Sequence, residues 1–145
     1  MLRTYSVVRD SSVSYEPGEV IDGPHAAARI IRRVFDTLDA DREHFVVFAC
    51  DVRMRVVGYK VVGQGTASAC IVHPREVFHA AITLGAHSLI LAHNHPSGDP
   101  SPSREDLALH ERMTEAGTLL GFPVLDGLVL GDERTWSMAE RGTLR

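Results

Sequence analysis

The sequence predicts a single α/β domain in which helices pack on a mixed β-sheet. Helix-like and strand-like patterns alternate along the chain, which is typical of sheets flanked by helices. Residues 88–92 form a continuous apolar run, as expected of a strand that is buried on both faces. The length of 145 residues and the hydrophobic content of 44% fit one ordinary domain with a core of its own.

The amino-terminal part of the chain differs in composition from the rest. Residues 1–24 are polar and contain Pro17, Gly18, Gly23 and Pro24. We expect these residues to form a partly ordered N-terminal arm with a strand over residues 4–8. A single domain is expected to follow over residues 25–145.

The first elements of that domain are predicted from side-chain periodicity. Apolar residues between positions 27 and 38 recur at helical spacing and form one stripe. Residues 45–50 and 53–62 are rich in strand-forming side chains and predict a hairpin that turns near residues 51–52. A further short strand is expected over residues 69–72.

Two later helices have clear boundary signals. Pro74 suits the first position of a helix, and Gly85 follows the apolar stripe and ends it. A second helix is predicted to begin near Ser103 and to end at Gly121. The closing strands are expected over residues 123–130 and 135–138.

The overall charge bears on the kind of partner. The net charge is −4 and the pI is near 6.0, which argues against nucleic acid as a partner of this chain alone. No apolar run approaches the ~20 residues needed to cross a bilayer, so no membrane association is expected. The first ten residues lack the apolar region of a signal peptide, and a cytoplasmic location is therefore expected.

The two cysteines carry no recognisable chemistry. Cys50 and Cys70 both lie among apolar residues and form no C-x-x-C pair. We expect them to be buried thiols in strands.

The most informative segment begins at the end of the predicted strand 88–92. His93 and His95 are two residues apart, so alternation along a strand directs both rings to the same face. Ser103 and Asp106 open the next predicted helix after a proline-rich loop. Helix capping alone would account for this Ser-x-x-Asp pair. Alternatively, the loop brings Asp106 to the histidines, giving two nitrogen ligands and one oxygen ligand.

Three protein ligands with one open position are typical of a catalytic zinc site. Bound zinc lowers the pKa of its water to roughly 7, and hydrolysis also needs a general base. Glu43 is the best candidate for that base, because it stands immediately before a predicted strand and can be directed into a site. The alternative is a solvated glutamate at the start of a strand.

These residues resemble a known family. The pattern His93-x-His95 followed ten residues later by Asp106, with Ser103 three residues before that aspartate, is similar to the JAMM (MPN-plus) metalloprotease signature. The wider similarity is to the bacterial RadC-like branch. It spans residues 43–142, about two-thirds of the chain. The similar stretches are EHFVVF, GQGT, HPREVFHAA, ILAHNHPSGDPSPSREDLAL, LLGFPVLDGLVLGD and WSMAERG.

The resemblance implies a fold and a chemistry. The fold would be a curved mixed β-sheet flanked by helices, similar to that of cytidine deaminases. His93, His95 and Asp106 would bind one Zn²⁺ per chain. Ser103 would help to hold the zinc-bound water or the developing oxyanion, and Glu43 would shuttle the proton. The activity would be cleavage of a peptide or isopeptide bond in a peptide or protein substrate, and a homo-oligomer is compatible with the sequence.

Two positions depart from the RadC-like pattern, and two other functions are weighed against hydrolysis. Threonine is usual where this chain has His110, and histidine is usual where it has Gly127. Of the alternatives, an accessory protein of DNA repair or recombination would require salt-dependent DNA binding. A non-catalytic MPN scaffold is the other alternative, although scaffolds of this kind typically lose the ligands that this chain keeps.

Overall fold

The computed structural model describes residues 1–4, 19–65 and 72–144. The strands expected over residues 4–8 and 69–72 lie, except for one residue each, outside the described residues, as does Cys70. In chain order the elements are α1 (Pro24–Phe35), β1 (Glu43–Cys50), β2 (Val56–Gly65), α2 (Pro74–Leu84), β3 (Ser88–Asn94), α3 (Arg104–Leu120), β4 (Val124–Leu130), β5 (Thr135–Ser137) and β6 (Gly142–Thr143).

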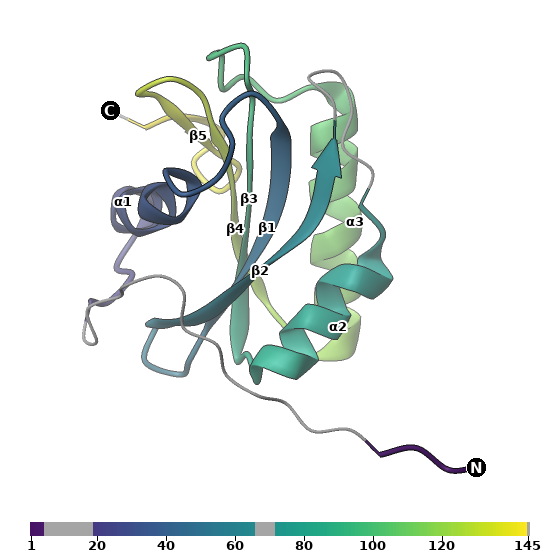
Figure 1. The fold of residues 1–145 in the computed structure, drawn as a ribbon. Coiled ribbons are helices and arrows are strands. Elements are labelled where there is room, and N and C mark those ends of the chain that lie inside the picture. Colours follow the sequence, from purple (N-terminus) through teal and green to yellow (C-terminus); the bar gives the residue numbers. More distant parts are fainter. Residues whose placement is uncertain (5–18, 66–71, 145) are drawn as a thin grey trace.

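The six strands form one mixed sheet in the order β2-β1-β3-β4-β5-β6. The pair β3 and β4 is parallel, and the other neighbouring pairs are antiparallel. Helix α1 lies on one side of the sheet, whereas α2 and α3 lie on the other (Figure 1). This mixed sheet flanked by helices confirms the predicted fold class.

Each face of the sheet has its own apolar core. On one face, Ile30 and Ile31 of α1 pack in a cluster with Val46 and Phe48 of β1. The alternate residues of β1 point the other way, and Val47 joins the cluster beneath α2 and α3. Because both faces are covered, every residue of β1 is buried, which fixes this strand and its ends firmly in place.

The helix boundaries follow from the capping signals. Pro74 begins α2 and Gly85 ends it in the left-handed conformation, with φ at 66°. Ser103 caps α3, and Gly121 ends that helix with φ at 82°. None of the helices in the described part of the chain has the length and apolar character needed to cross a bilayer.

The hairpin differs from the prediction in the length of its turn and in the bounds of its second strand. The second strand begins at Val56 rather than at residue 53, because residues 51–55 form the turn. The carboxylate of Asp51 accepts hydrogen bonds from the backbone N–H groups of Arg53 and Arg55 at 2.8 and 3.0 Å. Side-chain capping of this kind replaces ladder hydrogen bonds and lengthens the turn.

The bounds of α1 also differ from those of the predicted apolar stripe. Helix α1 begins at Pro24 and ends at Phe35, whereas the apolar stripe extended to residue 38. Leu38 still packs against the core beside α1, but it does so from the turn that follows the helix. A side chain can therefore continue the helical stripe after the helical backbone has ended.

Candidate metal centre

The candidate site lies where β1, β3 and α3 meet. Phe45 of β1 is the register partner of His93 in β3, so the start of β1 lies beside the end of β3. Glu43 is the first residue of β1, His95 directly follows β3, and Asp106 lies in the first turn of α3. The loop between β3 and α3 brings the helix start back to the strand that precedes it.

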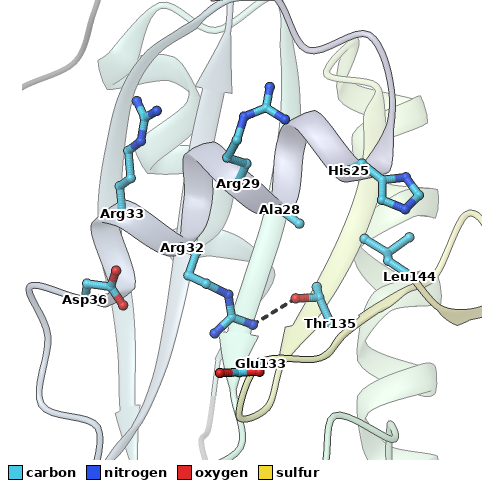
Figure 2. A pocket seen from close by; sticks show the side chains of 9 residues that line it. All are labelled: His25, Ala28, Arg29, Arg32, Arg33, Asp36, Glu133, Thr135 and Leu144. Carbon is cyan, nitrogen blue, oxygen red and sulfur yellow. Dashed lines mark hydrogen bonds between the residues drawn. The ribbon is translucent and has the colours of Figure 1, made fainter.

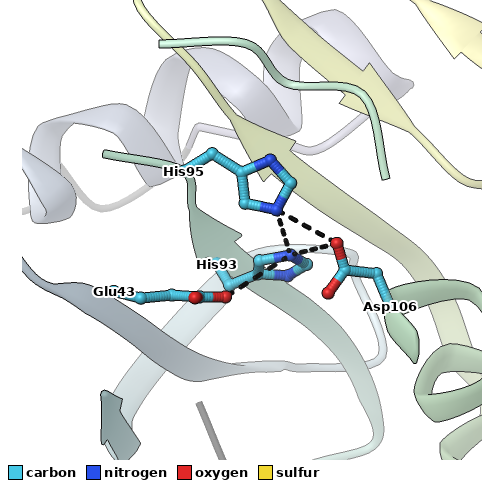
Figure 3. Close-up of side chains that lie close together, drawn as sticks. All are labelled: Glu43, His93, His95 and Asp106. Carbon is cyan, nitrogen blue, oxygen red and sulfur yellow. Dashed lines mark hydrogen bonds and ion pairs between the residues drawn. The ribbon is translucent and has the colours of Figure 1, made fainter. Parts of the chain in front are cut away.

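Four side chains converge at this corner, as Figure 3 shows. We call Glu43, His93, His95 and Asp106 the four-residue cluster; one ligand atom from each lies within 4.8 Å of the others. Nε2 of His93 is 3.2 Å from Nε2 of His95 and 3.3 Å from Oδ2 of Asp106. Nε2 of His95 is 3.0 Å from the same oxygen. The structure therefore brings together all three residues expected to be ligands, and the expected base with them.

The hydrogen-bond partners of His95 show which of its nitrogens carries a hydrogen. Nδ1 lies 2.8 Å from the carbonyl oxygen of Asp99, which can only accept, so Nδ1 is the donor. In the neutral ring Nε2 then bears a lone pair, directed at a carboxylate oxygen and at a second imidazole. Acceptor atoms can lie this close together only if a proton or a metal ion lies among them.

The spacing of the three atoms fits a zinc ion. Zinc bonded at about 2.0–2.1 Å in a tetrahedron separates its ligand atoms by about 3.3–3.4 Å. The three observed separations are 3.0, 3.2 and 3.3 Å. The fixed tautomer of His95 also matches a common arrangement, in which the other ring N–H of a ligating histidine donates to a carbonyl. The residues present therefore fit the ion that the sequence pattern implies.

The pKa shifts of Asp106 and His95 reflect how close these side chains lie to one another. Burial alone would raise the pKa of Asp106, but the hydrogen bonds that His93 and His95 donate to it when Nε2 carries a proton outweigh burial and hold that pKa well below the usual range. The hydrogen bond with Asp106 raises the pKa of His95, and burial opposes this effect. The site thus favours positive charge between the rings and the carboxylate, and a metal ion would compete with protons for that position.

Glu43 is held slightly apart from the other three residues. Its Oε1 lies 4.0 Å from Nε2 of His93, and its side chain is only 12% exposed. Burial is the largest influence on this carboxyl group and raises its pKa, while the nearby His93 opposes the shift. A buried carboxylate at this distance can reach a molecule placed between it and the three ligand atoms.

Ser103 has a structural role in the capping box. Its Oγ accepts a hydrogen bond from the backbone N–H of Asp106 at 3.0 Å. In return, Oδ2 of Asp106 accepts from the backbone N–H of Ser103 at 2.9 Å. The capping interpretation and the ligand interpretation of Asp106 are therefore compatible, since one oxygen caps the helix and also faces the histidines.

The sequence interpretation missed Asn94. Its Nδ2 donates to the carbonyl of Arg42 at 2.9 Å, and its Oδ1 accepts from the backbone N–H of His44 at 2.8 Å. These two bonds hold the residues on either side of Glu43 and so fix the start of β1. The available signal was a polar residue between two histidines, directed to the opposite side of the strand end.

The two positions that depart from the family pattern lie in contact with each other. Helix α3 brings the ring of His110 against Gly127 of β4, and a Cβ atom built on Gly127 would collide with Nδ1 of that ring. His110 lines a small cavity together with His93 and Asp106 of the four-residue cluster. The departures are thus neighbours of the site and are not among the three residues expected to be ligands.

A larger hollow on the α1 side has a different character (Figure 2). We call it the arginine pocket; it has a volume of about 390 Å³ and includes Arg29, Arg32 and Arg33 in its lining. Arg29 and Arg33 form ion pairs with Glu19 at 3.2 and 3.3 Å. Arg32 donates to Oγ1 of Thr135 at 3.0 Å and to two backbone carbonyls, so its guanidinium ties α1 to the β4–β5 connection and to β5.

The sheet order, the flanking helices and the cluster at the end of β3 define a protein of the JAB/MPN fold. Sequence comparison makes the assignment specific, because a family model described as "RadC-like JAB domain" matches residues 21–143. The chain belongs to the RadC-like JAB domain family.

Two similar proteins carry names that give no activity. The chain is 44% identical over 109 residues to a "UPF0758 protein" of Desulforamulus reducens, a match covering 75% of this chain and 48% of the relative. It is 41% identical over 134 residues to the "UPF0758 protein GWCH70_2550" of Geobacillus sp., covering 92% and 58% respectively. The chain thus spans about half the length of the curated relatives that it matches.

Proposed function

We propose that the protein is a zinc-dependent hydrolase that cleaves an amide bond in a peptide or protein. The observation that carries the proposal is the convergence of His93, His95 and Asp106, whose two imidazole nitrogens and one carboxylate oxygen lie within 3.3 Å of one another. Two imidazole nitrogens and one carboxylate oxygen at this spacing are a typical set of protein ligands for a catalytic zinc ion. One Zn²⁺ per chain is the expected complement.

The bound ion would supply a Lewis acid and an activated water molecule at neutral pH. Glu43 would take a proton from that water at Oε1 and later deliver it to the leaving amine. Its position supports this role over that of a fourth ligand, because it stands 4.0 Å from His93 while the ligand atoms are 3.0–3.3 Å apart. Its burial leaves its oxygens few other partners than a molecule in the site.

Ser103 would donate a hydrogen bond to the developing oxyanion. Its Oγ already accepts from the backbone of Asp106, which leaves the hydroxyl hydrogen to be donated elsewhere. The cap also fixes the position of the hydroxyl group, and preorganised donors of this kind contribute most to the stabilisation of a transition state.

The proposal is tested by metal analysis together with a peptide-library assay. Purified protein should contain about one zinc per chain. Incubation with a mixed peptide library should give new termini, detected by mass spectrometry, and a chelator should abolish them. Protein that takes up no zinc, even when zinc is supplied in excess, would overturn the assignment of the site.

A further inference from the structure

His93 and His95 are oriented in different ways. Nδ1 of His95 donates to the carbonyl of Asp99. Among the residues that the structure describes, the contacts of His93 are made by Nε2, and its Nδ1 has no hydrogen bond of this kind. Its ring lies parallel to that of Phe45, with a centroid distance of 5.9 Å, which fixes the plane of the ring but offers no hydrogen-bond acceptor. A ligating imidazole ordinarily needs a partner for its second nitrogen.

A small cavity lined in part by His93 adjoins the site. Its volume is about 10 Å³, and its polar side chains are those of His93, Asp106 and His110. The remaining lining residues, Phe45, Leu91, Gly127, Leu128 and Met138, are apolar or glycine. A space of this size holds about one water molecule, provided that polar groups are present to bind it.

The position of His110 depends on Gly127. His110 lies one helical turn after Asp106, on the same face of α3. A Cβ atom built on Gly127 would lie 2.8 Å from Cε1 of His110 and 3.0 Å from Cγ of Met138. The imidazole therefore occupies the volume into which a side chain from β4 would extend. Burial lowers the pKa of His110, which favours the neutral ring that can both donate and accept.

We propose that His110 is a positioning residue, which orients His93 by accepting its Nδ1–H hydrogen bond through one water molecule in this cavity. The inference rests on the proposed function, because it assigns His110 a role toward a metal ligand. It predicts that zinc binding requires an imidazole in this cavity, and that the imidazole can come from either α3 or β4. An imidazole extended from position 127 of β4 should serve the same cavity.

The test uses three variants of the full chain and one control. His110→Ala removes the imidazole, His110→Gln keeps a donor and an acceptor, and the double variant His110→Ala/Gly127→His supplies the imidazole from β4. His79→Ala removes an exposed histidine of α2 and is the control. For each protein we would measure zinc affinity by competition with a chromophoric chelator, the visible spectrum with Co²⁺, and the melting temperature without metal.

His110→Ala should weaken zinc binding about 10-fold and shift the Co²⁺ bands, as loss of a group that orients a ligand typically does. The double variant should return both properties to near wild-type values, and His110→Gln should do so in part. Wild-type affinity and spectrum in His110→Ala would overturn the inference, as would a double variant that folds normally without restoring them. A wild-type protein that binds neither metal would instead overturn the proposed function.

Discussion

The four-residue cluster and the arginine pocket both gather charged side chains, but they neutralise them differently. In the arginine pocket each arginine has an acceptor, either the Glu19 carboxylate or a carbonyl or hydroxyl oxygen. In the cluster, two imidazole nitrogens and a carboxylate oxygen face one another across 3.0–3.3 Å. The arginines of the pocket are thus paired within the protein, whereas the cluster is a group that could hold a cation. The size of a hollow is therefore a poorer indication of function than the balance of donors and acceptors in it.

The largest effect is expected when one of the proposed zinc ligands is removed from the cluster. His95→Ala should reduce the zinc content from about one per chain to near zero, because two protein ligands rarely hold the ion. Arg32→Ala in the arginine pocket is the matched control and should leave the zinc content unchanged. Inductively coupled plasma mass spectrometry of the dialysed proteins measures both. Full zinc content in the His95 variant would remove His95 from the ligand set.

A variant at Glu43 should distinguish zinc binding from catalysis in the cluster. Glu43→Gln keeps the size of the side chain and removes the base, so zinc should remain bound while the hydrolysis rate falls about 10²–10⁴-fold. Metal analysis and peptide cleavage are measured on the same sample. Loss of zinc in this variant would show that Glu43 is a fourth ligand.

Ser103 tests whether a capping residue also acts in the site. Ser103→Gly removes the hydroxyl group and costs only a few tenths of a kcal/mol of helix stability, whereas Ser103→Ala costs about 1 kcal/mol. If the hydroxyl group stabilises the oxyanion, both variants should lose activity, by about 10²-fold. Kinetics and thermal unfolding measured together distinguish the two roles. A fully active glycine variant would leave Ser103 with the cap alone.

Asn94 tests how far the position of the base matters. Asn94→Ala removes the two hydrogen bonds that hold the residues on either side of Glu43. Zinc should stay bound, and the rate of hydrolysis should fall roughly 10-fold, because a small displacement of a catalytic group is costly. Activity and zinc content equal to those of the wild type would show that the buried strand alone positions Glu43.

Cys50, at the end of β1 opposite to Glu43, is a buried thiol, and burial disfavours its ionised form. Burial raises the pKa of the Cys50 thiol to about 11. Below pH 9 this thiol is protonated in both the folded and the unfolded chain. Between pH 9 and 11 only the unfolded chain ionises it, so the free energy of unfolding falls as the pH rises. The expected loss by pH 10 is about 1 kcal/mol.

Denaturant titrations at pH 8 and pH 10 measure this loss. Cys50→Ala is the control and should show a smaller decrease over the same interval. An equal decrease in the two proteins would show that other groups cause the alkaline loss of stability.

The sequence predicted those features that depend on local chemistry. The proline and glycine signals placed the ends of α2 and α3, and the apolar run 88–92 identified the central strand β3. The spacing of His93 and His95 indicated two rings on one side, because alternation along a strand is a local property. The capping pair showed where α3 begins.

Features that depend on distant partners were not predictable. The contact between His110 and Gly127 joins a helix to a strand, and a single sequence gives no measure of the space between them. The two hydrogen bonds of Asn94 to the backbone of Arg42 and His44 join residues about fifty positions apart in the chain. The turn at residues 51–55 is local, but Asp51 could equally have stayed solvated, and then the shorter hairpin would have formed.

The shared oxygen of Asp106 has a consequence for dynamics. Oδ2 accepts from the backbone of Ser103 and also faces both imidazoles, so the start of α3 and the ligand group have an atom in common. A bound cation would draw electron density from the oxygen that anchors the first turn of the helix. Amide hydrogen exchange at the beginning of α3 should therefore respond to metal loading, while exchange near Gly121 should not.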